Sequence, residues 1–514
     1  MCVMKLNKYF MMGAMGLSLV ACSDNLDENG QGANGTNPNE GTTYVAFTVD
    51  FNNASSRAGE QPVDGEADSG DGNEADINDV RIIVTNEDGT VEFNDVATKK
   101  TVGLQDYFMI AIQPGMKNFY AIVNGESHGL TAPTTWGEKI LATITSEDNN
   151  DVNVKASDLY EYNATSGQGE GFVMSSIAAV PQRIYDNVTE EEAQAGPNNR
   201  VNITVDRMVA KVTVKLADKL VSNTGNDFGG ENFALKSLSA RIMNADNVKY
   251  ENSTLTYAGS YWMAYDNTSG VRETPYYSYI PGADVPETAL ESGSSQSLYA
   301  PGETTENPSR RFYCLENTHS NTADNTGYKQ GNTTYLKLEA TMVPEHLVTF
   351  GKSDDNITVT DKEYSGDAAT FYVVNGYSGE GDGEEVVYCV LASDLVAAYS
   401  KIVTEGTETE DDAKIEAVID ALETAGYKIE DVYENGVGTY RIPVNDIQEG
   451  GEYTNIQPVF RNDWYDIEIT GISLPGDPAG GGFDPEQPFH QSTNVAFVVT
   501  AREWNKVSHK VDLQ

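Results

Sequence analysis

Residues able to carry out catalysis are sparse in this chain of 514 amino acids and form no recognisable reactive group. Its five histidines, at positions 128, 319, 346, 490 and 509, do not have the spacing of metal ligands. The sequence has no Ser/His/Asp grouping and no Gly-rich phosphate loop. The 79 acidic residues leave open one enzymatic alternative, a carboxylate pair of the glycosidase type. We predict that the protein is not an enzyme and has no catalytic residue, metal site or cofactor.

Cysteine offers two kinds of covalent chemistry, lipid attachment and disulfide formation. Cys2 and Cys22 lie in a short leader at the N-terminus, whereas Cys314 and Cys389 lie in predicted strands far along the chain. The body of the chain therefore holds at most one internal disulfide, and its stability must come from packing. The sequence leaves open whether Cys314 and Cys389 form that disulfide or stay as two buried thiols.

The leader combines two lysines with a short apolar stretch, which is typical of a signal peptide and too short for a comfortable membrane span. The tetrapeptide Leu-Val-Ala-Cys that ends at Cys22 resembles a bacterial lipobox, so Cys22 is the predicted lipidation site. The alternative is an ordinary signal peptide followed by a chance cysteine. We expect an exported protein that is anchored to a membrane by lipid.

The net charge of the chain limits the classes of molecule that it can bind. With 79 acidic and 33 basic residues the formal net charge is −46. Nucleic acid is a polyanion and would be repelled over most of this surface, so we expect no nucleic-acid partner. The excess of acid is typical of a secreted molecule that must stay soluble.

Short segments in which apolar and polar side chains alternate dominate the chain, as is typical of half-buried β-strands. The predicted strands include 44–51, 80–85, 106–112, 118–123, 201–205, 208–216, 335–341, 371–374, 386–391 and 440–443. A helix is expected at Asp411–Ala425, where apolar residues share one face and Gly426 follows, and a shorter one at Ser393–Lys401. The prediction is a mainly β fold of two β-sandwich (transthyretin-like) domains with a few short helices.

These patterns divide the chain into four parts: a signal peptide at 1–21, a tether and propeptide strand at 22–57, an N-terminal sandwich at 58–218 and a C-terminal sandwich at 219–514. The acidic run Asp64–Asp76 lacks the register of an EF-hand, so we expect a solvated loop. Arg207 and Lys211 fall on the same face of the chain, where we expect them to pair with carboxylates and not to bind a ligand.

Two predicted strands near opposite ends of the chain present nearly the same side chains. Residues 45–49 read Val-Ala-Phe-Thr-Val and residues 495–499 read Val-Ala-Phe-Val-Val, so four of five positions are identical. One explanation is chance, because apolar alternation is common in β proteins. The other is that both strands fit the same groove. We assign Val45, Phe47, Val49 and Phe51 to a displaced strand, and Val495, Phe497, Val499 and Trp504 to a donor strand.

A cleavage site follows the first of these strands. Arg57 precedes Ala58 in a stretch of small and polar residues, and Arg81 is a rival site that lies within a predicted strand. Cleavage between Arg57 and Ala58 would release the strand at 44–51 and leave an unpaired sheet edge, which is a template for a strand of another chain. Head-to-tail insertion of this kind does not close on itself, so it builds a filament.

Other segments occur in an order that a known family shares. They are Gly171–Ser175, Val205–Val214, Phe312–Asn317, Tyr335–Ala340, Val459–Ile469 and Trp504, together with the lipobox at Cys22 and Ser-Arg-Ala at 56–58. Together these segments resemble the fimbrillin family, the subunits of type V pili, and within it the branch that includes the minor fimbrium subunit.

The resemblance implies a lipid-linked precursor that is carried to the outer membrane, cleaved after Arg57 by an Arg-specific extracellular protease and polymerised into adhesive fimbriae. The implied partners are other copies of the chain, related fimbrial subunits and a receptor on a host or bacterial surface. We expect a stalk subunit, because a cleavage site and a free tail are both present. The alternatives are an anchor or tip subunit, and a surface lipoprotein that binds glycan and never polymerises.

Overall fold

The chain divides into two units, Met1–Glu40 and Gly41–Gln514, and the computed structural model describes residues of the second. The predicted signal peptide, Cys22, Arg57 and Ala58 lie outside the described residues. The described residues are 41–51, 71–102, 105–129, 156–176, 179–217, 233–246, 285–300, 309–317, 328–354, 356–364, 366–377, 385–404, 406–445, 456, 458–472, 474–479, 481–489 and 495–504.

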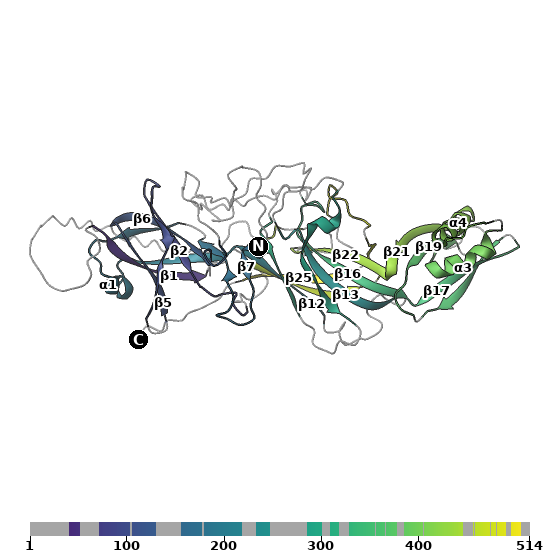
Figure 1. The fold of residues 1–514 in the computed structure, drawn as a ribbon, viewed down its shortest axis with the longest axis horizontal. Helices are drawn as coiled ribbons and strands as arrows, with labels where there is room; N and C mark the ends of the chain where they lie inside the picture. Colours follow the sequence, from purple (N-terminus) through teal and green to yellow (C-terminus); the bar gives the residue numbers. More distant parts are fainter. Residues whose placement is uncertain are drawn as a thin grey trace, which may run out of the picture. The chain divides into compact units, whose positions relative to one another are not determined.

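The N-terminal part is built on one nine-stranded sheet with the order β3-β2-β6-β9-β11-β1-β5-β4, in which β10 pairs with β6 (Figure 1). Its strands are β1 (Thr43–Phe51), β2 (Val80–Asn86), β3 (Val91–Val96), β4 (Thr98–Val102), β5 (Gln105–Ile112), β6 (Gly115–Val123), β9 (Met174–Ser176), β10 (Val180–Ile184) and β11 (Arg200–Arg207). Phe47 on β1 packs edge-on against Phe119 on β6, with 5.4 Å between ring centroids. Because β9 and β11 separate β1 from β6 along the ladder, the sheet must curve around its own core.

Short elements complete this part of the chain. They are the 3-10 helix η1 (Ala156–Asp158), the two-stranded pair β7 (Tyr160–Glu161) and β8 (Gly171–Phe172), and the helix α1 (Glu190–Ala195). α1 begins with a capping box, in which the Thr189 side chain accepts from the backbone of Glu192 and the Glu192 side chain accepts from the backbone of Thr189.

The next part is a sandwich of two sheets around one core. One sheet has the order β15-β12-β23-β25 and the other β14-β13-β16-β22-β24. Buried side chains of both sheets, such as Val212 on β12 and Leu338 on β16, belong to the same hydrophobic cluster. The elements are β12 (Val209–Leu216), β13 (Phe233–Met243), η4 (Glu287–Leu290), β14 (Glu291–Tyr299), β15 (Arg310–Leu315), β16 (Tyr335–Pro344), β22 (Val437–Pro443), β23 (Asp463–Ile472), β24 (Asp477–Pro478) and β25 (Val495–Glu503).

The chain passes from the first sheet to the sandwich at Met208. This residue alone separates β11, which belongs to the nine-stranded sheet, from β12, which pairs with β15 and β23. The sequence pattern placed β12 in the N-terminal domain, which we expected to end near residue 218. The apolar alternation continues through both strands, so it carries no sign of the change of sheet.

Residues 345–436, the inserted unit, interrupt the second sheet of the sandwich. β16 and β22 pair directly, with Thr341 opposite Val437, so the chain leaves the sheet and returns to the same place. The inserted unit has its own core, which includes Phe350, Leu395 and Val418. Its elements are β17 (His346–Ser353), β18 (Asn356–Glu363), β19 (Phe371–Tyr377), β20 (Glu385–Leu391), α3 (Ala392–Ile402), α4 (Asp411–Thr424), β21 (Lys428–Tyr433) and η5 (Glu434–Gly436).

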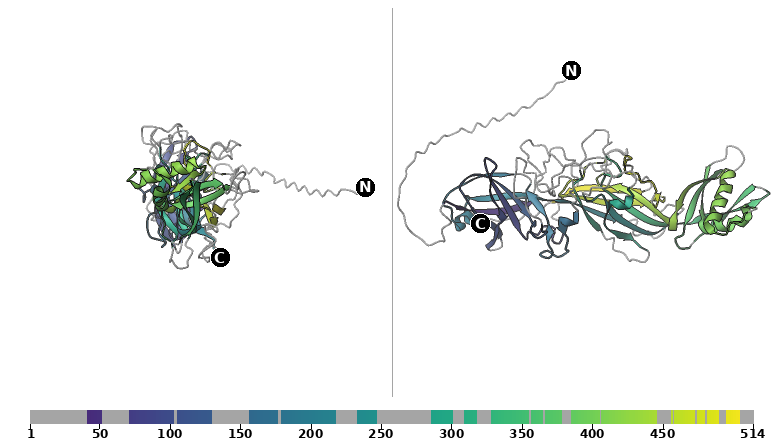
Figure 2. Two further views of the ribbon diagram at one scale, coloured as in Figure 1. Left: turned by 90° about the vertical axis from the view of Figure 1, so that its right-hand side faces the viewer. Right: turned by 45° about the horizontal axis from the view of Figure 1, so that its top comes forward.

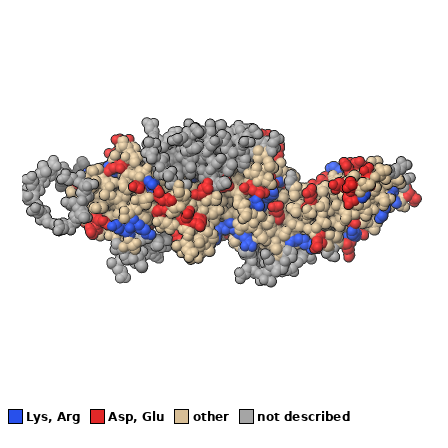
Figure 3. Space-filling view, in the orientation of Figure 1, with Lys and Arg blue, Asp and Glu red and all other residues tan. Residues whose placement is uncertain are grey.

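Within the inserted unit, α3 packs against α4 and against β17 (Figures 1 and 2). Residues 346–433 contain 20 acidic and five basic residues, a net charge of −15 out of −46 for the chain. Figure 3 shows Asp and Glu side chains gathered around this unit. The repulsion of polyanions expected from the sequence is therefore strong here.

The structure confirms the prediction of a mainly β fold with a few short helices. The two helices expected from sequence correspond to α3 and α4, within one residue at each end. Cys314 on β15 and Cys389 on β20 are free thiols in different sheets, which settles the question that the sequence left open. In the described part of the chain, no helix has the length and apolarity that a bilayer crossing needs.

Candidate functional site

The strand predicted to be displaced occupies an interior position of the nine-stranded sheet. β1 pairs in parallel with β11, for example Phe47 opposite Val201, and antiparallel with β5, with Phe47 opposite Phe108. Both of its edges therefore carry hydrogen bonds. If β1 left, β11 and β5 would each keep a row of unpaired backbone groups facing an open slot.

The side chains of β1 fill the core on one face. Val45 and Phe47 are fully buried, and Val49 is partly buried against the same core. Phe51 is part of the strand, with Val205 as its partner on β11. Val45, Phe47 and Val49 therefore all contact the core on the same side of β1.

The predicted donor strand, β25, lies at the edge of the four-stranded sheet of the sandwich. It pairs antiparallel with β23, with Phe497 opposite Ile469 and Val499 opposite Ile467. Phe497 is buried in the core of the sandwich and Val499 packs against it. Val495, the first residue of the strand, is paired with Ile472. The predicted donor strand is therefore paired within its own chain.

Trp504, directly after β25, belongs to a different core from the strand that carries it. Its side chain is fully buried in the core of the N-terminal part, where the ring stacks on Tyr313 at 5.8 Å and meets Phe172 edge-on at 5.5 Å. The Arg207 guanidinium lies over the ring at 4.4 Å. Arg207 Nη1 also donates to the backbone oxygen of Trp504 at 2.5 Å, and Trp504 N donates to Asn462 O at 3.2 Å. These contacts anchor the end of β25.

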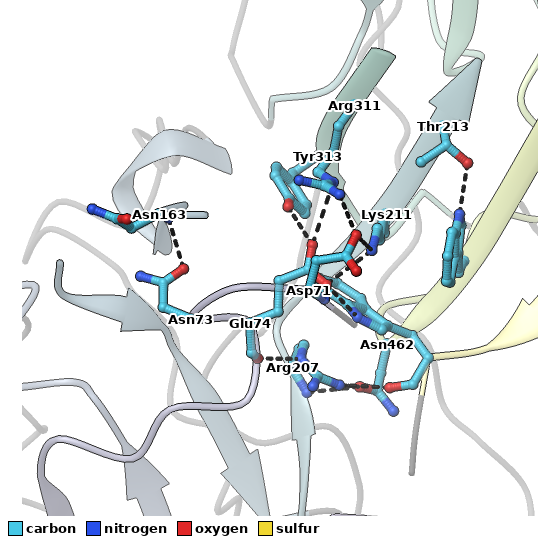
Figure 4. Close-up of polar contacts among 12 residues, drawn as sticks. Asp71, Asn73, Glu74, Asn163, Arg207, Lys211, Thr213, Arg311, Tyr313 and Asn462 are labelled. Atoms are coloured by element: carbon cyan, nitrogen blue, oxygen red, sulfur yellow. Dashed lines mark hydrogen bonds and ion pairs between the residues drawn. The ribbon is translucent and has the colours of Figure 1, made fainter. Parts of the chain in front are cut away.

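A buried carboxylate, Glu74, joins this anchor to the segment that follows the predicted cleavage region (Figure 4). Its side chain accepts hydrogen bonds from Tyr313 Oη at 2.6 Å, from Lys211 Nζ at 2.8 Å and from Trp504 Nε1 at 3.2 Å. The backbone N–H of Asp71 donates to it at 2.8 Å. We call Glu74, Arg207, Lys211, Tyr313 and Trp504 the anchor cluster.

Neighbouring residues hold the Glu74 turn in place. The Asn73 side chain donates to Glu161 O at 2.8 Å and to Gln168 O at 2.9 Å, and Asn73 N donates to Asn163 O at 2.9 Å. The backbone oxygen of Glu74 accepts from Arg207 Nε at 2.7 Å. The prediction of a solvated loop over the acidic run is therefore wrong for its last part, because Asn73 and Glu74 are fully buried.

In the anchor cluster, burial and the negative charge of Glu74 shift the pKa values of Arg207 and Lys211 in opposite directions. Burial lowers the pKa of Arg207 to about 10, and the negative charge of Glu74 works against this lowering. Burial also lowers the pKa of Lys211, again opposed by Glu74. Burial and the nearby Glu74 carboxylate raise the pKa of Tyr313 well above its ordinary value. Each charged member thus depends on its partners, because removing one leaves an uncompensated charge in the interior.

The sequence predicted part of this cluster. Lys211 has the carboxylate partner that we expected, in Glu74, while Arg207 binds carbonyl oxygens and the face of Trp504. Glu74 itself was missed, since one acid among many in a Gly- and Asp-rich run gives no signal of burial. Tyr313 lies in a segment that carried the family resemblance, and this was the only available hint. Among the described residues, no group of three or more His, Cys, Asp or Glu is placed to hold a metal ion.

The comparisons with known proteins agree with the resemblance seen in the sequence. Residues 431–510 match the family model described as "Major fimbrial subunit protein type IV, Fimbrillin, C-terminal". No curated protein matches the chain. The matched segment includes β22, β23, β25 and Trp504, so it contains the proposed donor strand and its anchor.

Several solved structures are similar to this chain at low sequence identity. A putative cell adhesion protein from Parabacteroides distasonis ATCC 8503 has 17% identity and a TM-score of 0.39, covering 90% of this chain and 98% of that one. A fimbrilin, FimA, from Porphyromonas gingivalis W83 has 14% identity and a TM-score of 0.37, with coverages of 90% and 97%. The tip fimbrial protein Mfa3 from Porphyromonas gingivalis, with C-terminal truncation, has 12% identity and a TM-score of 0.32, with coverages of 90% and 100%. The C-terminal region of the chain, residues 431–510, is therefore similar to the C-terminal region of the fimbrillin family.

Proposed function

We propose that this chain is a structural subunit of an adhesive fimbrium at the cell surface, exported as a lipoprotein on Cys22, cleaved after Arg57 and polymerised by donor-strand exchange. The observation that carries the proposal is the position of β1. The segment on the N-terminal side of Arg57 fills an interior slot of a sheet, and the C-terminal strand repeats its Val-Ala-Phe-x-Val pattern. Such a role needs no catalytic group.

The driving force is the apolar slot that β1 would leave. Val45 and Phe47 are fully buried and Val49 partly so. A donor that supplies Val495, Phe497 and Val499 in their place would bury three apolar side chains, worth about 5–9 kcal/mol before ordering costs. It would also pair with both unpaired edges, β11 and β5, at about 1 kcal/mol for each backbone hydrogen bond.

The donor must first leave its own subunit. β25 is an edge strand with a single ladder to β23, so its release breaks fewer backbone hydrogen bonds than a strand in the interior slot would form. Release also pulls Trp504 out of the anchor cluster, at a cost of about 3–5 kcal/mol for a buried Trp side chain. In the exchange, β25 therefore changes from an anchored edge strand of its own subunit to an interior strand of the next subunit. Each subunit offers one slot and one donor strand, and this head-to-tail arrangement favours a filament.

A second candidate follows from the anchor itself. The protein would then be a fimbrial anchor or tip, or a surface lipoprotein that binds glycan and never polymerises. Such a protein would keep β1 in its N-terminal sheet and β25 in its own sandwich. The full burial of Phe497 and Trp504 within one subunit suits such a protein.

N-terminal sequencing and an unheated denaturing gel of the protein extracted from cells separate the two candidates. A stalk subunit gives a new N-terminus at Ala58 and a ladder of bands that collapses on heating. The Arg57→Ala variant should keep the precursor monomeric, while Arg81→Ala, the matched control, should polymerise normally. A lipidated Cys22 on a single monomer band in the unmodified protein would refute the stalk role and favour the second candidate.

A further inference from the structure

The outer face of β1 is buried at one point, under α1. Ala46 is fully buried and belongs to a small cluster with Met109 on β5 and with Val188 and Ala193, which lie just before and within α1. The chain leading into α1 is tied to β1, since Tyr44 N donates to Val188 O at 3.1 Å. The space above Ala46 is therefore closed by a fixed neighbour.

The core face of the slot does not distinguish between the two directions in which a donor strand could run. The pattern Val-x-Phe-x-Val reads the same in both directions, so Val495, Phe497 and Val499 fit the core either way. The outer face is different, because the donor has Ala496 on one side of Phe497 and Val498 on the other. A donor in the direction of β1 places Ala496 at the position of Ala46. A reversed donor places Val498 there, which adds two methyl groups in a space that holds one.

Register is restricted by the same neighbour. A shift by one residue would turn Phe497 toward the outer face and away from the core, because successive side chains on a strand point to opposite faces. A shift by two residues in the direction of β1 would put either Val498 or the residue before Val495 beneath Val188 and Ala193. The in-register, same-direction arrangement places an alanine under α1 and the three apolar side chains in the core.

We propose that α1 sets the direction and register of subunit assembly, so that residues 495–499 of a second copy insert parallel to β11 and antiparallel to β5 with Ala496 under α1. This inference rests on the proposed function and specifies its interface. In the β1 register, Ala496 lies opposite Arg200 on β11 and Met109 on β5, and Val498 takes the position of Thr48 opposite Asn202. Thr48 Oγ1 donates to Asn202 Oδ1 at 3.0 Å, which shows that these positions adjoin on the outer face.

Disulfide trapping between subunits tests the direction in which the donor strand inserts. All variants carry Cys389→Ser to remove the less buried native thiol. Asn202→Cys with Val498→Cys should give a covalent ladder that survives boiling without reductant. Asn202→Cys with Ala496→Cys, the matched control, reports a reversed donor centred on Phe497 and should give none. Cross-linking by the Ala496→Cys pair alone, or a ladder that neither pair traps, overturns the inference while the proposed function stands. Absence of polymer from the cleaved, unmodified protein overturns both.

Changing the size of the donor side chain that would lie under α1 tests the role of this helix directly. Ala496→Leu should lower the yield of polymer by at least tenfold, whereas Val498→Leu should leave it within twofold. Val188→Ala, which enlarges the space above the slot, should restore part of the polymer formed by Ala496→Leu. Thermal unfolding of each uncleaved precursor checks that the variants fold. Equal polymer yields from the two leucine variants, with both precursors folded, would refute a selective role of α1.

Discussion

The Glu74 carboxylate accepts a hydrogen bond of 3.2 Å from the indole of Trp504, although 430 positions separate the two residues in the sequence. Glu74 lies in the first described segment after the predicted cleavage region, and Trp504 follows the predicted donor strand. One contact thus joins the two parts of the chain that the proposed assembly would rearrange. The anchor cluster around it is the natural target for experiments on the unassembled subunit.

Trp504→Ala should free the end of β25 in the precursor. The change removes a fully buried ring and its contacts with Tyr313 and Arg207, at a cost of about 3–5 kcal/mol. Hydrogen exchange of the backbone amides of β25 and β23 should rise well above that of β16. Trp504→Phe keeps a ring and should show a smaller rise. If the exchange of β25 stays unchanged in Trp504→Ala, the ring does not hold the strand.

Glu74→Gln should destabilise the folded subunit by about 3–5 kcal/mol, because it leaves the buried cation of Lys211 without its carboxylate. Replacing both partners, in Glu74→Gln with Lys211→Met, should recover much of the loss, since no unpaired charge then remains. Urea unfolding of the three proteins measures the effect. Additive losses in the double variant would show that the two residues are not coupled.

Phe47→Ala and Phe497→Ala should differ in their effect on the polymer. Phe47 is fully buried in the precursor but would leave with the propeptide, so its truncation should destabilise the precursor by about 3–5 kcal/mol and leave the heat resistance of assembled filaments unchanged. Phe497→Ala should weaken both forms, because this side chain is buried in its own subunit and would also fill the slot of the next. Filaments unaffected by Phe497→Ala would indicate that another segment is inserted.

The free energy of unfolding should fall as the pH rises above about 9. Burial raises the pKa of Cys389 to about 12 from its ordinary value of 9.0, and it raises the pKa of Tyr160 to about 12 from 10.0. The unfolded chain releases these protons first, so their stabilising contribution is complete below pH 9 and is lost as the pH approaches 12. Lys211, whose pKa is lowered by burial, acts in the opposite direction.

Urea unfolding at about pH 8 and pH 10.5 measures this dependence, and thiolate absorbance follows Cys389. Cys389→Ala should show a smaller loss of stability between the two pH values than the unmodified protein. An equal loss in both would mean that other groups cause the alkaline weakening.

Removal of the inserted unit should leave the sandwich folded. β16 and β22 pair directly and residues 345–436 have a core of their own, so a short Gly-containing turn can replace them. The sandwich should be less stable after the deletion, because Leu347, Phe371, Leu391 and Tyr433 of the inserted unit also belong to the sandwich core. Circular dichroism and urea unfolding should show a β-rich, cooperatively folding protein. Deletion of α4 alone, as a control, should be worse than deletion of the whole unit, because it uncovers the core around Leu395.

The individual helices and strands were easier to predict from the sequence than the pairing between strands. β1, α3 and α4 were visible in the sequence because alternation and helical periodicity are local properties of the chain. The change of sheet at Met208 and the return of the chain from β16 to β22 depend on pairing between distant strands, which periodicity does not encode. The burial of Glu74 was hidden for a related reason, since its cation comes from Lys211, 137 positions away.

The order in which the strands become available also follows from the position of β1. β1 is the first strand among the described residues, yet the slot that it fills needs both β5 and β11, and Ala46 pairs with Arg200, 154 positions later. During synthesis the slot therefore forms only after β1 is already present. The second copy of the Val-Ala-Phe-x-Val pattern, residues 495–499, is made after β1, β5 and β11, when β1 can already occupy the slot. If the two strands compete for the slot as proposed, chain order would give the N-terminal copy the kinetic advantage and would protect newly made subunits from joining one another too early.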